Sequence, residues 1–148
     1  MSKVIQALLS GVFFTFILDF FILLGVKLHY INFYGVQVYY NILFADHQNI
    51  FLFLFFSLII GFLVMYANTK TALIVIGSLF VLSFSTLIPP IGKIVGEMML
   101  MKKNVTLKTD KFSYHGNIYY DGRKTITLYD NELKKVIILN KNKIQGQY

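Results

Sequence analysis

The sequence contains no cysteine and, over its first 92 residues, almost no charge. The absence of thiols excludes disulfides, thiolate nucleophiles and zinc or iron–sulfur sites held by cysteine. Residues 1–92 hold three lysines and two aspartates, whereas 56% of the whole chain is hydrophobic. A segment so poor in charge and so rich in apolar side chains predicts a membrane protein.

Motifs for catalysis are also missing. The chain has no Gly-x-Ser-x-Gly turn, no glycine-rich phosphate loop and no pair of carboxylates spaced for acid–base chemistry. His29, His47 and His115 show no metal-ligand spacing, and the adjacent Asp46 and His47 are interpreted as solvated neighbours rather than a site. We therefore expect neither an enzyme nor a metal or cofactor.

Three long apolar runs predict transmembrane helices over residues 4–27, 48–66 and 71–88. Each approaches the roughly 20 residues that a helix rising about 1.5 Å per residue needs to cross about 30 Å of hydrocarbon. A short membrane-proximal helix is expected over 91–102. Residues 1–103 together form the predicted transmembrane domain.

The only prolines, Pro89 and Pro90, follow the third run directly. They supply no amide donors and disfavour helical geometry at Ile88, so we expect a kink or a stop there. Residues 28–49 are too polar to cross a membrane and too aromatic to leave its interface. The alternation of their side chains suits a short strand, and a surface helix is equally compatible.

Residues 104–148 form a predicted basic, β-rich domain, either a meander or a small barrel. A three-residue loop that ends at Arg123 would place Ile118 opposite Ile126, which keeps the apolar side chains of both strands on one face. Turns are expected at Asp121-Gly122 and at Asp130-Asn131. The expected strands are 105–109, 112–120, 124–129 and 134–140.

Small residues recur four apart in three places, a spacing that lets two helix backbones approach closely. They predict tight helix packing, either within the chain or between chains. The pairs are Gly11 with Thr15, Ser57 with Gly61, and Gly92 with Gly96.

Asp19 is the only acidic residue within the predicted spanning runs. A carboxylate near the centre of a spanning helix costs about 2.5 to 3.5 kcal/mol on insertion scales, so it should face protein or water. We interpret it as a neutral or hydrogen-bonded acid that holds the first helix to the third through Ser83, Ser85 or Thr86. A proton or cation carrier in an ion-driven machine is the alternative.

Charge is concentrated after residue 92, where eleven basic and five acidic side chains leave a net charge of +6. Lys93, Lys102 and Lys103 lie close to the membrane on this side. The positive-inside rule therefore predicts a cytoplasmic C-terminus and a periplasmic N-terminus. The composition, rich in Lys, Ile, Phe and Asn, favours a bacterial inner membrane. The basic tail suits anionic lipid headgroups or an acidic protein rather than nucleic acid.

Together these features predict a small polytopic accessory or assembly factor. Its helices would bind an integral membrane partner in a larger complex, such as an ion-driven motor or export machine, and its tail would make a second contact.

A self-associating ion channel or mechanosensor is the alternative. Three spans, a broken third helix and a small β-domain resemble the layout of small-conductance mechanosensitive channels, and Gly116-x-Ile118 and residues 136–140 are similar to their β-domain. Residues 71–88 lack the alternating glycine and alanine of that family's pore.

Cell fractionation tests the predicted class of protein. We expect the chain to sediment with membranes, to resist an alkaline carbonate wash and to need detergent for release, because its apolar runs are unstable in water. A peripheral protein released by the same wash is the control. Recovery of the chain in the aqueous supernatant would contradict the membrane assignment.

Overall fold

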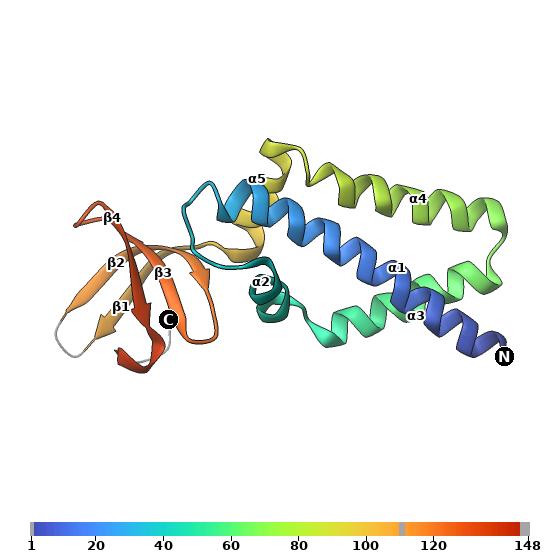
Figure 1. Ribbon diagram of the computed structural model, residues 1–148, viewed down its shortest axis with the longest axis horizontal. Helices are drawn as coiled ribbons and strands as arrows, with labels where there is room; N and C mark the ends of the chain where they lie inside the picture. Colours follow the sequence, from blue (N-terminus) through green and yellow to red (C-terminus); the bar gives the residue numbers. More distant parts are fainter. Residues whose placement is uncertain (1, 110–111, 146–148) are drawn as a thin grey trace.

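The computed structural model describes residues 2–109 and 112–145. Positions 110–111 and 146–148 of the predicted β-rich domain lie outside the described residues. The molecule is elongated, with helices at one end, a curled sheet at the other and the N-terminus at the far tip of the helices (Figure 1). The helices are α1 (Lys3–Val26), which continues into the π-helical turn η1 (Lys27–Ile31), α2 (Tyr40–His47), α3 (Ile50–Tyr66), α4 (Thr69–Ser85) and α5 (Pro89–Leu100).

Helices α3 and α4 begin at asparagine caps. The side-chain oxygen of Asn49 accepts from the backbone N–H groups of Phe51 and Leu52 at 3.0 and 3.2 Å, which starts α3. Asn68 caps α4 in the same way. Pro89 and Pro90 occupy the first turn of α5, where a missing N–H leaves no helical bond unmade. The double proline therefore starts a new helix, and α4 and α5 meet at 93°.

One helix in the described part of the chain, the continuous run Lys3–Ile31, is by itself long and apolar enough to cross a membrane. The prediction of three such helices is thus supported for one. Helices α3 and α4 have 17 residues each, and they qualify only if each bent pair, α2 with α3 and α4 with α5, is a single span. The expected run 48–66 is shortened because Asn49 caps α3. The expected run 71–88 is displaced, because Asn68 caps α4 and the helix ends at Ser85.

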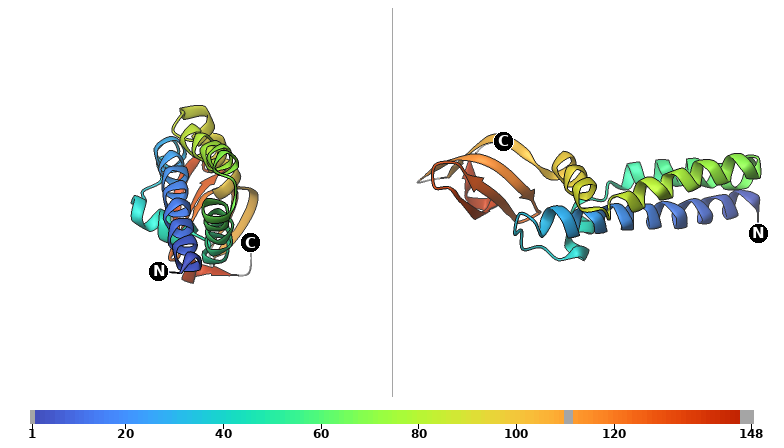
Figure 2. Two further views of the ribbon diagram at one scale, coloured as in Figure 1. Left: turned by 90° about the vertical axis from the view of Figure 1, so that its right-hand side faces the viewer. Right: turned by 90° about the horizontal axis from the view of Figure 1, so that it is seen from above.

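Segment 28–49, for which the sequence allowed a strand or a surface helix, contains the helix α2. It meets α3 at 84°. Helices α1, α3 and α4 run side by side, with α2 and α5 beside the end of α1 that faces the sheet (Figures 1 and 2).

Helices α1 and α3 make the closest contact of the bundle, through small residues. A Cβ atom on Gly11 would overlap the carbonyl of Ser57, and one on Gly61 would overlap the carbonyl of Ala7. Only glycine permits this approach, because any side chain would force the two backbones apart. The side-chain oxygens of Thr15 and Ser57 are buried in the same contact and have no hydrogen-bond partner among the described residues.

The described sheet has five antiparallel strands in the order β4-β3-β2-β1-β5. Although β4 and β5 lie at opposite edges, only the three-residue turn η2 (Lys141–Lys143) separates them. Such a connection reaches at most about 14 Å, whereas the edges of a flat five-stranded sheet would be about 19 Å apart. The sheet is therefore curled. Its strands are β1 (Lys102–Thr109), β2 (Ser113–Asp121), β3 (Thr125–Asp130), β4 (Lys135–Asn140) and β5 (Ile144–Gln145).

The curled sheet encloses its own small core. Leu107, Ile118, Ile126 and Leu128 are fully buried in it. Full burial of such a side chain is worth about 1.5 to 3 kcal/mol. They come from β1, β2 and β3, and Ile126 and Leu128 are two residues apart in β3, as the twofold period of a strand requires.

The expected register of the β2–β3 hairpin is wrong. Ile118 lies opposite Leu128 rather than Ile126, because the hairpin tip is wider and lies further along the chain than expected. A bulge between Ile118 and Tyr120 shifts the pairing back by one residue. Four residues, 122–125, separate the last paired residues of the hairpin, one more than predicted. The wider tip lets Arg123 reach away from the sheet toward α2.

Paired glycine substitutions test the close contact of α1 and α3. Gly61→Ala should lower the stability by about 1 to 3 kcal/mol, because its methyl group has no room beside α1. Gly77→Ala on α4 is the control, since nothing lies within 4 Å of the added Cβ. It should be neutral or raise stability by about 0.5 to 1 kcal/mol. Thermal unfolding in detergent, followed by circular dichroism, measures both; equal shifts would contradict the packing.

Candidate functional site

The helices meet the sheet at one cluster of buried side chains, which we call the junction. It joins the end of α1, η1, the segment before α2 and α2, which follow one another in the sequence, to α5 and β2, which come much later. The fully or nearly buried members are Val26, Tyr30, Ile31, Val36, Val38, Leu43, Leu100 and Tyr120.

Two tyrosines of the junction are held by hydrogen bonds. Tyr30, which has no exposed surface, donates to the carbonyl oxygen of Tyr119 at 2.8 Å. Tyr34 donates to Glu97 Oε1 at 2.7 Å, and its ring lies 4.3 Å from that of Tyr119. Burial, followed by the hydrogen bond to Glu97, raises the pKa of Tyr34 above its ordinary value, so the hydroxyl stays protonated and continues to donate.

The hairpin between β2 and β3 is anchored to the last turn of α2. Arg123 pairs through Nε with Asp46 Oδ1 at 2.7 Å and donates through Nη2 to the carbonyl oxygen of Ala45 at 2.7 Å. Tyr120 donates to Asp46 Oδ2 at 2.7 Å. The Asp46 side chain is only 6% exposed, so both of its oxygens need these donors. A cation at the C-terminal end of α2 also suits the helix dipole.

Asp121, at the start of the same hairpin tip, joins two further lysines. Its carboxylate lies 2.9 Å from Lys102 Nζ and 2.6 Å from Lys141 Nζ. Burial acts to raise the pKa of Asp121, but the hydrogen bonds from Lys141 and Lys102 outweigh it, and the pKa lies below its usual value. The carboxylate therefore stays charged and ties β1, the hairpin and η2 together.

His47 packs against the anchored hairpin. Its ring centroid lies 5.3 Å from that of Tyr120, and its Nε2 atom is buried without a hydrogen-bond partner among the described residues. Burial lowers the pKa of His47; Asp46 and Asp121 oppose this shift and Lys141 adds to it. The imidazole is therefore neutral at pH 7, in contrast to the solvated side chain expected from the sequence.

Asp19 lies beside the bend between α2 and α3 rather than against α4. Gln48 donates to Asp19 Oδ2 at 3.4 Å. The partners that we expected bond elsewhere: Ser83 and Thr86 donate to the backbone carbonyls of Leu18 and Phe21, and Ser85 donates within α4. The reason is helical geometry, because Leu18 faces α4 and Asp19 is turned about 100° from it.

The remaining predicted residues have separate positions. Gly92 and Gly96 bring α5 against the end of α1, where a Cβ on Gly96 would overlap the ring of Tyr30. Lys93 Nζ lies 3.7 Å above the centroid of Phe33, a cation–π contact. Lys103 is exposed at the start of β1.

The junction was not recognised from the sequence. The sequence predicts a turn at Arg123, the only arginine of the chain, and a solvated pair of Asp46 with His47. The available signal was the single arginine of the chain, which stands in a turn between Gly122 and Lys124. Its partner, 77 positions earlier, required the fold.

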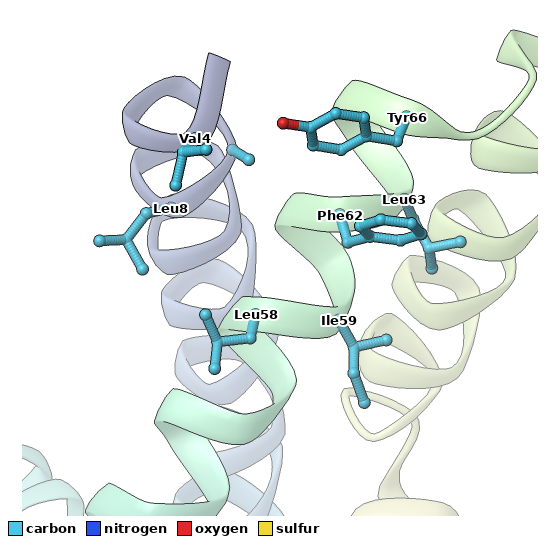
Figure 3. A pocket seen from close by; sticks show the side chains of 8 residues that line it. Val4, Leu8, Leu58, Ile59, Phe62, Leu63 and Tyr66 are labelled. Atoms are coloured by element: carbon cyan, nitrogen blue, oxygen red, sulfur yellow. The ribbon is translucent and has the colours of Figure 1, made fainter. Parts of the chain in front are cut away.

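The described surface has several grooves, and two of them bear on function. An apolar one of about 710 Å³ lies between the N-terminal end of α1 and the C-terminal end of α3. Figure 3 shows it between Val4 and Leu8 on one side and Phe62 and Tyr66 on the other, with the Tyr66 hydroxyl directed toward α1. The second, which we call the junction groove, measures about 640 Å³ and lies between α2 and the β2–β3 hairpin.

Within the described residues, no group of three or more histidine or acidic side chains is placed to hold a metal ion. A scan against protein-family models, a search of curated proteins and a search of solved structures each found no match for this chain. Its function is therefore argued from its own geometry.

The buried imidazole of His47 predicts a loss of stability in mild acid. The pKa of His47 in the folded state lies below the ordinary 6.5. The neutral ring therefore makes its full contribution to the stability of the fold above pH 6.5. This contribution is lost as the pH falls toward the lower folded value. The melting temperature should therefore decrease as the pH is lowered from about 7.5 to about 5. The substitution His47→Phe should make the melting temperature depend less on pH.

The matched control is His115→Gln. That histidine is exposed on β2, where its Nδ1 lies 2.8 Å from Thr106 Oγ1. The pH dependence should persist in this variant. A slope that is the same in the wild type and in His47→Phe would show that the junction does not respond to this proton.

Proposed function

We propose that this protein is a small multi-pass accessory or assembly factor of a bacterial inner membrane, bound to a larger complex through its helices. The observation that carries the proposal is the bare outer face of α4. Leu73, Ile74, Val81 and Leu82 are 65 to 69% exposed, and an added Cβ on Gly77 would touch nothing within 4 Å. A small residue among exposed aliphatic side chains suits the close approach of another helix.

Three helices crossing the membrane is the arrangement that best fits the bundle. Helices α1, α3 and α4 lie side by side (Figure 2), and 17 residues of helix span about 26 Å, close to the hydrocarbon of a thin bilayer. Exposed aromatic and aliphatic side chains cover α3, including Phe51, Phe55 and Phe62. Lipid is a favourable solvent for such a surface, whereas water is not.

In this placement, Asp19 lies at the edge of the hydrocarbon. Its partner Gln48 immediately precedes Asn49, the cap of α3. At the level of Asp19, α2 lies at 84° to α3, as a helix along the membrane surface would. An acid at this edge can reach water, so we assign it to packing rather than to ion transport.

The junction fixes the position of the sheet relative to the helices, so the two surfaces offered to a partner keep a constant geometry. Arg123 and Tyr120 hold the sheet to α2, and Tyr30 holds it to the end of α1. A partner that binds α4 in the membrane would thus meet the basic sheet at a defined position on the cytoplasmic side. Lys93, Lys102 and Lys103 favour that side by the positive-inside rule.

A homo-oligomeric channel or mechanosensor is the second candidate. The 93° break between α4 and α5, directly before the sheet, favours it. A rigid break of this kind can convert lateral movement of a spanning helix into movement of the domain that follows. Conductance in planar bilayers, together with the stoichiometry in detergent, distinguishes the two candidates.

Photo-crosslinking from native membranes tests the bare face of α4. A photoreactive amino acid at Ile74, which is 68% exposed, should give a discrete adduct with a different membrane protein, identified by mass spectrometry. The matched control is Phe55 on α3, which is 57% exposed and should give no discrete protein adduct. No adduct at position 74 would refute the accessory function. An adduct with a second copy of the chain, together with conductance, would establish the channel instead.

A further inference from the structure

The junction groove has two unlike walls. One wall belongs to α2 and the segment before it, where the apolar side chains of Val38, Ile42 and Ala45 lie beside the polar side chains of Gln37 and Asn41. The other belongs to the hairpin and presents Lys124 and Thr125. A groove that combines apolar side chains with basic and hydroxyl-bearing ones suits an amphiphile rather than a purely polar or purely apolar ligand.

The net charge of the groove is positive. Its one acidic lining residue, Asp46, is buried and already paired with Arg123 and Tyr120. The Lys124 side chain is exposed and has no ion pair or side-chain hydrogen bond among the described residues. The guanidinium of Arg123 has five N–H groups, more than its two contacts to α2 require. The free donors therefore favour an anion.

The groove lies at the level where lipid headgroups are expected. Helix α2 packs beside Phe16 and Phe20 of α1, since the rings of Phe16 and Phe44 are 5.8 Å apart and Tyr40 donates to the Phe20 carbonyl at 3.0 Å. This is the height of Asp19, at the edge of the proposed hydrocarbon layer. The side chains of Tyr39 and Ile42, 79% and 45% exposed, border the groove.

We propose that the junction groove binds the phosphate headgroup of an anionic phospholipid between α2 and the hairpin tip. Lys124 and the free N–H groups of Arg123 contact the phosphate, and the acyl chains pass Ile42 and Tyr39 into the bilayer. The bound lipid links α2 to the sheet and reinforces the pair of Asp46 with Arg123. This site goes beyond the accessory function, because it requires the membrane but no protein partner.

Fluorescence quenching by brominated lipids tests the site. The chain contains no tryptophan, so Tyr39→Trp places a single reporter at the groove, where the tyrosine side chain is exposed. The protein is reconstituted into bilayers of phosphatidylcholine that contain a small fraction of brominated phosphatidylglycerol or, separately, brominated phosphatidylcholine. We expect quenching at a lower mole fraction of the anionic lipid.

Removal of single lysine charges then shows which residue gives the preference for the anionic lipid. Lys124→Gln in the reporter background should reduce the preference for the anionic lipid about five-fold, which corresponds to ~1 kcal/mol. Lys108→Gln is the matched control, because it removes the same charge from the exposed distal part of β1 and should keep the preference. Circular dichroism establishes that each variant is folded.

The remaining outcomes separate the site from the membrane placement on which it depends. Equal quenching by the two lipids overturns the site and leaves the membrane placement intact. Equal loss of preference in Lys124→Gln and Lys108→Gln also overturns it, since general surface charge would then explain the selectivity. Competition by inorganic phosphate would show a site for free phosphate instead of lipid. Absence of quenching by either lipid overturns the placement of α2 at the membrane surface.

Discussion

The buried carboxylate of Asp46 is the constraint on which the arrangement of the molecule depends. A charge that is removed from water must be paired, or it costs several kcal/mol. Both available donors, Arg123 and Tyr120, come from the β2–β3 hairpin. Satisfying one residue of α2 therefore positions the whole sheet against the helices, and the apolar junction cluster closes around that contact.

The same constraint explains the shape of the hairpin. A tight turn at Asp121-Gly122 would direct Arg123 along the sheet, whereas the observed four-residue tip lets it reach α2. The bulge before Tyr120 adjusts the direction of that side chain as well. Local turn preference yields here to the electrostatic requirement of a distant residue, because a turn preference is worth less than an unpaired buried charge.

Small residues and aromatic residues divide the packing between them. Gly11 and Gly61 bring α1 and α3 into backbone contact, which apolar side chains alone would not do in lipid. At the junction, tyrosines provide both apolar surface and a hydroxyl that reaches a partner, as Tyr30 and Tyr34 do. The proposed membrane region is thus held together by the close approach of helix backbones. The junction is held together by paired polar groups within an apolar cluster.

The sequence alone determined the helical and β-rich halves, the break of the helix at the double proline and the closely spaced small residues, because hydrophobic period, proline chemistry and glycine spacing are local properties. It did not determine the extent of α3 and α4, the register of the hairpin or the neighbours of Asp19. These depend on which side chains meet across the fold. Only the tertiary structure placed Asp46 beside Arg123, 77 positions later, since an ion pair between distant residues has no signature in either local sequence.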